Sequence, residues 1–391
     1  MAKYEIIDGV GIIPPGVTTI EDEAFYRCEN LTSVVIPDSV TTIGSWVFWD
    51  CKNLTSIVIP DSVTTIDPGA FCGCANLTSI VIPDSVTTIR SDAFSDCSSL
   101  TGIVVEEENP RYDSRNNCNA IIETATNTLI CGCSTTIIPD SVTTIGSDAF
   151  LRCENLTSIV IPDSVTEIES EAFYGCENLT SIEIGNSVTT IEYGAFYGCE
   201  NLTEVIIPDS VITIESGVFS HCENLTSIVI PDSVTTIEYG AFSGCKGLTN
   251  IVIPDSVTTI ESEAFYDCEN LTSIVIPDSV TEIGSSAFWG CRSLKNIVIP
   301  DSVTTIDPGA FRGCENLTSI VIPDSVTEIG ELAFCGGANL TSIVIPNSVT
   351  MIGTGAFFGC YALEKIYVSK GKVDYFKGLL PAELHDKIVE R

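Results

Sequence analysis

The feature that most constrains the fold of this chain is a repeat of 23 residues. Phe25, Phe48, Phe71 and Phe94 are spaced at this interval, and the same step recurs without a miss from 150 to 357. The string IPDSV lies in the same repeat and occurs eleven times. Such a short period is typical of proteins that stack one small unit after another around a continuous core. We therefore expect a repeat solenoid, although 391 residues would ordinarily suggest two or three globular domains.

The residues of one repeat indicate what each turn contains. In Leu54–Asn76, apolar and polar residues alternate over 54–59, which predicts a strand with one buried face. Pro60 lacks an N–H donor and is followed by Asp and Ser, so the strand should end there. Residues 63–66 predict a short extended or turn-like stretch, and 68–74 predict a single helical or 3-10 turn. The inward positions then stack from turn to turn.

The pattern LxxIxIPxSVxxIxxxAFxxC closely resembles the BspA-like, or Treponema-type, leucine-rich repeats, and it covers nearly the whole chain. The resemblance implies a right-handed curved solenoid with a parallel β-sheet on one face. It also implies mostly strands and turns, with short 3-10 or helical turns and a small C-terminal helical cap. Members of this family are expected to bind, often as adhesins at a cell surface, and the resemblance carries no catalytic residues.

Breaks in the repeat predict four segments. We expect an N-terminal cap and repeats over 1–97, an aberrant repeat over 98–137, regular repeats over 138–369 and a helical cap over 370–391. The aberrant segment is similar to the hairpin-bearing turn of the family. In the cap, residues 375–380 have helix-like apolar spacing, and a second short helix is predicted from Ala382 to Val389.

Eighteen cysteines are present, and thirteen of them occupy one repeat position. Every member of that column has an equal neighbour on both sides, so disulfide pairing would be arbitrary. A ladder of buried free thiols is therefore our main expectation, with disulfides between neighbouring turns as the alternative. The CxC pairs Cys72/Cys74 and Cys131/Cys133 have only two histidines to join them, His221 and His385. We expect no metal site and no cofactor.

The net charge of −36 argues against nucleic acid and anionic membranes as partners. No stretch approaches the length of a membrane span, and MAKYEIIDGVGIIPPG contains no run typical of a signal peptide. We expect a cytoplasmic protein, or a cell-surface or secreted one if an export signal was removed. Many thiols also favour a reducing compartment. A monomer that binds an unknown protein or surface ligand is the expected assembly.

Acidic residues form two columns along the repeat. One column is the Asp of IPDSV, at positions 38, 61, 84, 140, 163, 209, 232, 255, 278, 301 and 324. The other is a Glu, at positions 29, 154, 177, 200, 223, 269 and 315. Asp suits an Asx-type turn, in which its side chain bonds backbone amides. The alternative is Ca²⁺ bound between neighbouring turns, because like charges this close repel one another.

Variable positions beside the Ala-Phe pair are the candidate partner-binding residues. They are Tyr26, Trp46, Trp49, Tyr174, Tyr193, Tyr197, Tyr239, Tyr266, Trp289, Arg312 and Phe358. Exposed aromatic residues often anchor interfaces, and the alternative is that they pack sideways over the neighbouring turn. A second candidate surface is a stripe of outward-facing valines on the strands, interrupted by Glu183 and Glu204.

We expect a non-catalytic binding scaffold that mediates protein–protein interaction or adhesion through the aromatic-rich edge, the strand face, or both. No Gly-rich phosphate loop and no arrangement of Ser, His and Asp suited to nucleophilic catalysis is found in the sequence. The alternative is a structural or surface-coat protein that stacks through its solenoid ends, possibly with Ca²⁺ on the acidic columns.

Overall fold

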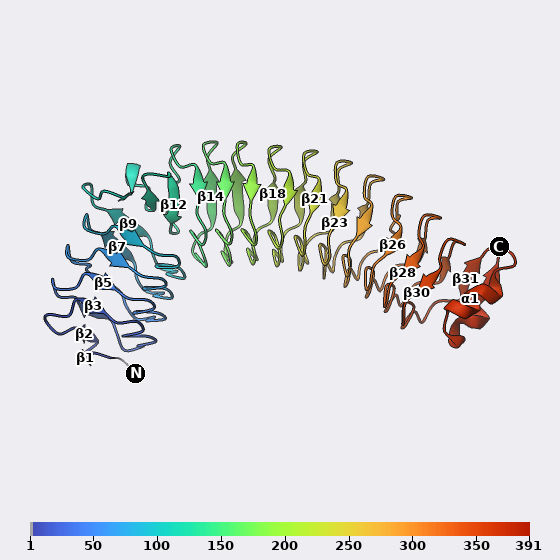
Figure 1. Ribbon diagram of the computed structural model, residues 1–391, viewed down its shortest axis with the longest axis horizontal. Helices are drawn as coiled ribbons and strands as arrows, with labels where there is room; N and C mark the ends of the chain where they lie inside the picture. The colour runs from blue at the N-terminus through green and yellow to red at the C-terminus, as the bar shows by residue number, and fades with distance from the viewer. Residues whose placement is uncertain (1–2) are drawn as a thin grey trace. The chain divides into compact units, whose positions relative to one another are not determined.

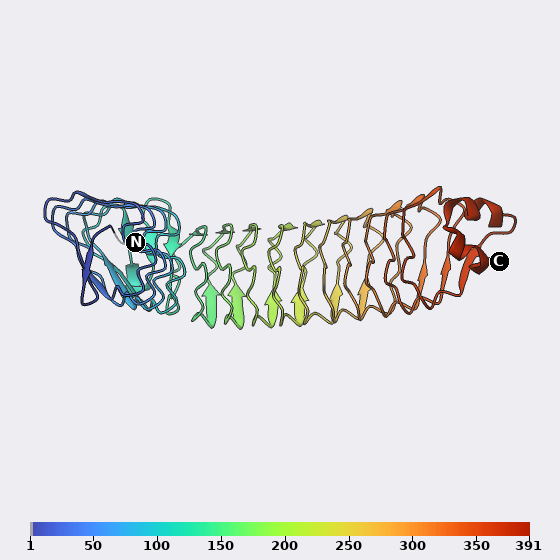
Figure 2. The ribbon, with the colours of Figure 1, turned by 90° about the horizontal axis from the view of Figure 1, so that it is seen from below.

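The computed structural model describes residues 3–391, and the chain divides into two compact units, with the boundary between Glu200 and Asn201. In each unit the chain winds into stacked turns of one repeat each, so that each unit is a β-solenoid (Figure 1). The turns are joined by short parallel strands that lie at equivalent places in successive repeats (Figure 2).

The unit before residue 201 begins with a hairpin, in which β1 (Glu5–Ile7) pairs antiparallel with β2 (Val10–Ile12). The strands with an outward valine in this unit are β4 (Ser33–Val35), β7 (Ser79–Ile82), β9 (Gly102–Val105) and β14 (Ser158–Ile161), and β16 (Ser181–Ile184) continues the column with Glu183 in the outward place. A second column of two-residue strands contains β3 (Thr19–Ile20), β5 (Thr42–Ile43), β6 (Thr65–Ile66), β8 (Thr88–Ile89), β13 (Thr144–Ile145), β15 (Glu167–Ile168) and β17 (Thr190–Ile191).

The unit from residue 201 onward has the same two columns. Its column with outward valines contains β20 (Ser227–Val229), β22 (Asn250–Val252), β24 (Ser273–Val275), β27 (Ser319–Val321) and β29 (Ser342–Val344). β18 (Glu204–Ile206) and β31 (Lys365–Val368) extend it with Ile206 and Tyr367 in the outward place. Its second column contains β19 (Thr213–Ile214), β21 (Thr236–Ile237), β23 (Thr259–Ile260), β25 (Glu282–Ile283), β26 (Thr305–Ile306), β28 (Glu328–Ile329) and β30 (Met351–Ile352). The stretch predicted as extended or turn-like is therefore a second parallel ladder.

The segment around each Ala-Phe pair is a turn and not the expected 3-10 or helical turn. Residues two before and two after the phenylalanine have positive φ, as at Gly69 (62°) and Gly73 (76°) around Phe71. Two left-handed residues in this short stretch prevent a continuous helix. Alternate backbone N–H groups reach the next turn of the solenoid, as when Phe71 donates to the carbonyl of Ala93 (N···O 2.8 Å), and those between them bond within the turn, as when Cys72 donates to Gly69 (3.1 Å).

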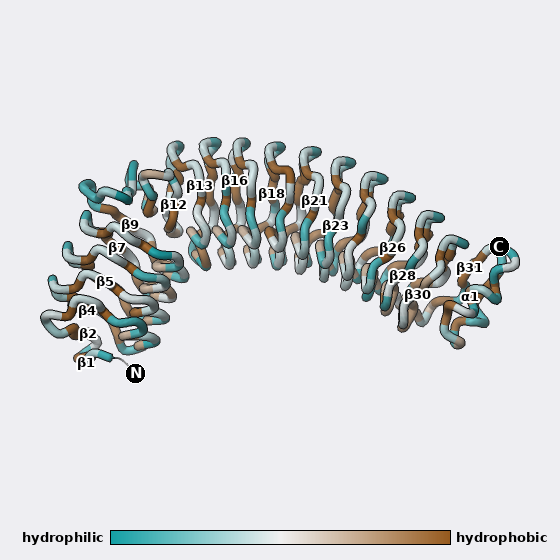
Figure 3. The backbone as a smooth tube through the Cα atoms, viewed as in Figure 1, coloured by the Kyte–Doolittle hydropathy of each residue, from teal (hydrophilic) through white to brown (hydrophobic). Residues whose placement is uncertain are grey.

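Stacked phenylalanines form the centre of each unit. Ring centroids of neighbouring turns lie 5.2–5.5 Å apart from Phe25 to Phe94, and 5.4–5.8 Å apart from Phe219 to Phe357. The rings are nearly parallel, and most of them are fully buried. Hydrophobic residues recur at the same place in successive turns (Figure 3). One repeat buries almost nothing by itself, so the stability of each unit comes from contacts between turns.

The cysteine column is buried beside the phenylalanines. Ten of its thiols lie 3.0–3.3 Å from the carbonyl oxygen of the phenylalanine one turn earlier, as Cys74 does from Phe48 (3.3 Å). Each thiol thus donates to a buried carbonyl and has no need of a disulfide partner. Burial raises the pKa of the Cys51 thiol to about 12, which keeps the reactive thiolate scarce at neutral pH.

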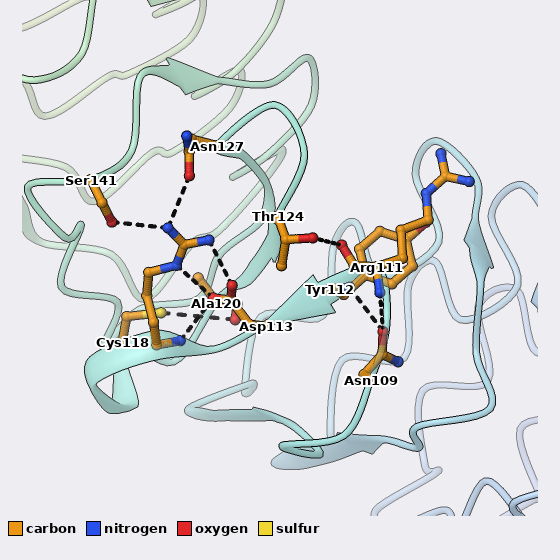
Figure 4. Close-up of polar contacts among 10 residues, drawn as sticks. Asn109, Arg111, Tyr112, Asp113, Cys118, Ala120, Thr124, Asn127 and Ser141 are labelled. Atoms are coloured by element: carbon orange, nitrogen blue, oxygen red, sulfur yellow. Dashed lines mark hydrogen bonds and ion pairs between the residues drawn. The ribbon is translucent and has the colours of Figure 1, made fainter.

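The aberrant segment forms a small antiparallel sheet. β10 (Tyr112–Asp113), β11 (Ile121–Glu123) and β12 (Thr128–Cys131) pair in this order, and β12 then runs parallel to β13. A short 3-10 helix, η1 (Arg115–Asn117), lies between β10 and β11. The Arg115 guanidinium donates to Asp113, to Asn127 (2.9 Å) and to Ser141 (3.1 Å), which holds the loop against the following turn (Figure 4).

The C-terminal cap differs from the two expected helices. It contains α1 (Val373–Leu379) with Phe376 buried, then the 3-10 helix η2 (Ala382–Lys387). The predicted continuation of this second helix to Val389 is wrong, because β32 (Ile388–Glu390) adds a parallel strand beside β31. The edge of β31 presents backbone groups that need partners, and the β-branched pair Ile388 and Val389 suits a strand.

Candidate interaction surfaces

Six of the predicted aromatic residues pack in pairs on neighbouring turns. Tyr26 stacks on Trp49 (centroids 4.7 Å, planes 12° apart) and Tyr174 on Tyr197 (4.7 Å, 2°). Tyr266 and Trp289 form a tilted pair (5.5 Å, 52°). All six are partly buried or only just exposed. This is the sideways packing over the neighbouring turn that was the alternative to partner binding.

Arginines cover two of these pairs. The Arg27 guanidinium carbon lies 4.9 Å from the Trp49 ring centre, and that of Arg312 lies 4.1 Å from the Trp289 ring centre. A guanidinium over an indole face is a favourable cation–π contact. Arg312 therefore stabilises the aromatic ladder of its own turns, which reduces its availability as a separate anchor.

The other four predicted aromatic residues project from the turns. Trp46, Tyr193, Tyr239 and Phe358 are 47%, 55%, 52% and 70% exposed. Trp46 has a left-handed backbone (φ 53°), and its indole lies over Gly69, where any added Cβ would be 2.5 Å away. The Tyr239 hydroxyl donates to Glu263 (2.7 Å). The structure thus distributes the predicted anchors along the edge instead of gathering them into one patch.

Sequence reasoning missed one exposed aromatic residue. Tyr361 lies three positions after Phe358 and is 85% exposed. The sequence could have indicated this residue, because it follows Cys360 directly, where most other repeats have a charged or small residue. Together, Phe358 and Tyr361 give the last regular turn two large exposed apolar side chains.

The outward valines form a continuous column in the second unit. Parallel pairing aligns Val252 with Val275 and Val321 with Val344. We call the exposed members of this column the valine stripe. They are Ile206, Val229, Val252, Val275, Val298 and Val321. They are 54–75% exposed, whereas the isoleucines on either side of each are mostly buried. Glu204 does not interrupt the stripe, because it pairs with Ser227 while Ile206 pairs with Val229.

An exposed column of aspartates follows the valine stripe three residues further along each repeat, as Asp232 follows Val229. In the repeat of Asp232 the turn is closed without the aspartate: the Val234 N–H donates to the Pro231 carbonyl (3.1 Å), and the Ser233 hydroxyl donates to Val211 of the preceding turn (2.6 Å). Its carboxylate is therefore presented at the surface. Asp163 does bond a backbone amide, accepting from the Asn186 N–H of the next turn (2.7 Å). Within residues 3–391, no group of three or more His, Cys, Asp or Glu is arranged to hold a metal ion.

The two histidines lie in different parts of the chain. His221 sits at a left-handed turn position (φ 58°) and is exposed. His385 lies in η2, with its Nε2 atom 3.1 Å from the Leu380 carbonyl oxygen. Over the described residues, no helix has the length and apolar character needed to cross a bilayer.

Comparison with known proteins agrees with this architecture. Residues 11–121, 129–249 and 235–364 match the family model described as the BspA type leucine rich repeat region. No curated protein matches the chain. Among solved structures, a leucine-rich repeat protein from Bacteroides ovatus is 28% identical, with a TM-score of 0.60 over 98% of this chain and 92% of that one. Another, from Eubacterium ventriosum, is 25% identical, with a TM-score of 0.55 over 90% and 82%.

The family match extends over most of the chain, and the solved relatives share its stacked-turn architecture. This chain belongs to the BspA-type leucine-rich repeat family.

Proposed function

We propose that this protein is a non-catalytic scaffold that binds a protein partner along the valine stripe. The observation that carries the proposal is the stripe itself: six β-branched residues on consecutive turns are more than half exposed. Isolated exposed apolar residues are ordinary, but a contiguous apolar column on a protein this acidic is typical of an interaction surface. Every repeat also has room for a polar residue at this position, as Glu183 demonstrates in the first unit.

The charges around the stripe favour a basic partner. The aspartate column runs beside the valines, and the whole chain has a net charge of −36. A partner segment with alternating apolar and Lys or Arg side chains would bury the valines and pair with the carboxylates. Its association would be accelerated by the negative field and would weaken with added salt.

The experiment compares capture of partners from source cells by three forms of the full chain. In the first variant, Val252, Val275 and Val298 are replaced by Thr, which keeps the β-branched shape and removes the apolar surface. In the second, Tyr193 and Tyr239 are replaced by Ser. We expect the threonine variant to lose the captured protein and the serine variant to retain it. Retention by the threonine variant would refute binding on the stripe.

The aromatic edge is the second candidate surface, favoured by the pair Phe358 and Tyr361 at 70% and 85% exposure. It would be supported if replacement of these two residues by Ser abolished capture while the threonine variant bound normally. An adhesive role at a cell surface belongs to the same proposal, with the partner then being a surface protein. The buried thiols favour a reducing compartment instead, and thiol labelling in intact cells distinguishes the two.

A further inference from the structure

The step from one solenoid turn to the next sets the spacing that a partner on the valine stripe must match. In the second unit, phenylalanine ring centroids of neighbouring turns lie 5.4–5.8 Å apart, and hydrogen-bonded strands in general lie about 4.8 Å apart. An α-helix completes one turn in about 5.4 Å. An extended strand presents every second side chain to the same face, at intervals of about 6.6 Å. The step of the solenoid is therefore close to that of a helix and shorter than that of a strand.

The mismatch grows along the stripe, which takes five steps from Ile206 to Val321. At a step of 5.6 Å, as between Phe288 and Phe311, a strand would run ahead of the valines by about 5 Å over these steps, which is nearly a whole turn. A helix would fall behind by only about 1 Å. At the closest spacing of about 4.8 Å, the two departures become about 9 Å and about 3 Å. A helix therefore stays closer to the register of successive valines than a strand does.

The backbone of the stripe also favours a helix. Its inner strands have neighbours on both sides: β27 pairs with β29, and Val321 of β27 forms a bridge with Val298 on its other side. A partner strand therefore finds no free edge in the middle of the stripe and can lie only across the side chains. There its own N–H and C=O groups would face valines without hydrogen-bond partners, which is unfavourable. A helix pairs these groups internally and presents only side chains.

The two sides of the stripe differ in charge. On one side lies the aspartate column, and none of its members in this unit forms an ion pair with a Lys or Arg of residues 3–391; these exposed members are Asp209, Asp232, Asp255, Asp278, Asp301 and Asp324. On the other side, two positions before each valine, the exposed residues are neutral and polar: Ser227, Asn250, Ser273, Asn296 and Ser319. A partner that fits both sides has basic residues along one flank only.

The aspartates lie within reach of such a flank. Each follows its valine by three residues, which span at most about 10 Å of extended chain. A helix with its side chains has a radius of about 5–6 Å, and the flexible stem of a Lys or Arg extends further from the flank. A helix centred on the valines can therefore pair its basic residues with this column.

We propose that the partner segment is an amphipathic α-helix with one basic flank, and that it lies lengthwise on the valine stripe. The inference rests on the proposed function and gives the apolar and basic residues of that partner the period of a helix. Apolar residues three and four positions apart would contact successive members of the stripe. Five steps of 5.4–5.8 Å correspond to roughly 19 residues of helix at about 1.5 Å each.

The test titrates the full chain with two synthetic peptides of about 20 residues and identical Leu, Lys and Gln composition, a length that follows from the helix rise. The helical-period peptide has Leu three and four positions apart with Lys along one flank, and in the alternating peptide Leu and Lys alternate along the centre. We expect the helical-period peptide to bind with a Kd below about 10 μM at low salt and the alternating peptide to bind at least about tenfold more weakly. Far-UV circular dichroism should show that the bound peptide gains helix, and added salt should weaken its binding.

Three variants locate the peptide, each made in a chain with Val58→Thr and Val81→Thr so that the valines of the first unit do not bind it. The threonine variant of the stripe should weaken the helical-period peptide about tenfold or more. A variant with asparagine beside the same three valines should weaken it about tenfold and reduce its salt dependence; the replaced residues are Asp255, Asp278 and Asp301. A control with the same change in net charge should differ less than about twofold; it combines Glu331→Gln, Glu383→Gln and Asp386→Asn.

The outcomes separate this inference from the proposed function. Equal affinity for the two peptides, or no binding of the helical-period peptide by about 100 μM, would overturn the helix while the threonine variant still lost its cellular partner. Equal losses in the asparagine variant and the charge control would show attraction to net charge alone and would overturn it as well. If the threonine variant kept both the peptide and the cellular partner, the proposed function itself would be wrong.

Discussion

The phenylalanine ladder of the first unit breaks where the aberrant segment enters, and this break predicts that two neighbouring phenylalanines differ in their contribution to stability. Phe71 lies between two rings, with centroids 5.2 Å away on both sides, whereas Phe94 has a ring at 5.2 Å on one side and a cavity of about 240 Å³ on the other. Both side chains are buried, at 0% and 5% exposure. The variants Phe71→Ala and Phe94→Ala therefore remove the same atoms from similar surroundings, apart from one ring contact.

Truncation of a buried phenylalanine to alanine lowers the free energy of unfolding by about 3–5 kcal/mol, which includes the void left behind. An aromatic contact adds about 0.5–1.5 kcal/mol beyond the area buried. We therefore expect Phe71→Ala to be more destabilising than Phe94→Ala by about 1 kcal/mol. Because the second variant enlarges a void that already exists, its neighbours lose fewer contacts, and this acts in the same direction.

Urea unfolding followed by far-UV circular dichroism measures the difference, with the slope of the transition compared between variants because long repeat arrays can unfold in parts. Amide hydrogen exchange over residues 48–97 then shows whether the loss is local. If Phe94→Ala proves as destabilising as Phe71→Ala, the gap beside Phe94 is closed in solution, and the reasoning from the ladder is wrong.

Three further predictions test other parts of the structure. Gly240→Ala should lower the free energy of unfolding by about 1 kcal/mol, because φ is +60° although the nearest atom to the new methyl is 3.8 Å away; an unchanged urea midpoint would contradict the left-handed turn. Under native conditions a thiol reagent should react first with the partly exposed Cys72 and Cys335, and all eighteen thiols should react after denaturation without reductant; a denatured count near zero would establish disulfides. Burial and a hydrogen bond with Asp92 raise the pKa of Asp148 to about 7 in the folded chain, from about 4 when unfolded, so that folding takes up a proton there. Its contribution to stability is complete below about pH 4 and is lost as the pH rises through about 7, so Asp148→Asn should flatten this part of the pH–stability profile; an unaltered slope would contradict the raised pKa.

Much of the fold follows from the sequence because its determinants repeat. The 23-residue step, the inward phenylalanines and cysteines and the outward valines are each visible as columns, and the structure places them as parallel stacks. Other features of the turn could not be predicted from the repeat. The left-handed positions are filled by residues as different as Gly69, Trp46 and Leu332, so no single residue type marks them, and the turn was predicted as helical.

The cap and the cavity escaped prediction for a different physical reason. Residues 388–390 become a strand because β31 leaves an open edge beside them, which is a property of the assembled sheet and not of the local sequence. The cavity lies between the turns of Phe94 and Phe150, which are 56 residues apart in the sequence. The backbone of the inserted segment separates these two turns. Asp92 and Asp148 are the only two aspartates at this repeat position, where the other acidic members are Glu, but the sequence does not show that their two turns lie together.

The valine stripe and the aberrant segment show opposite properties of the same architecture. Along the valine stripe, each turn presents nearly the same surface as the next. A compact ligand therefore cannot distinguish one turn from another. Selective binding requires a partner that is long enough to contact several turns at once. A small molecule requires a place that differs from all others, and a solenoid has such a place only where its repeat is broken. The aberrant segment supplies such a break: it omits one phenylalanine and places Asp92 and Asp148 beside the same pocket. An insertion in a uniform repeat can thus create a single pocket without disturbing the stacking of the turns on either side.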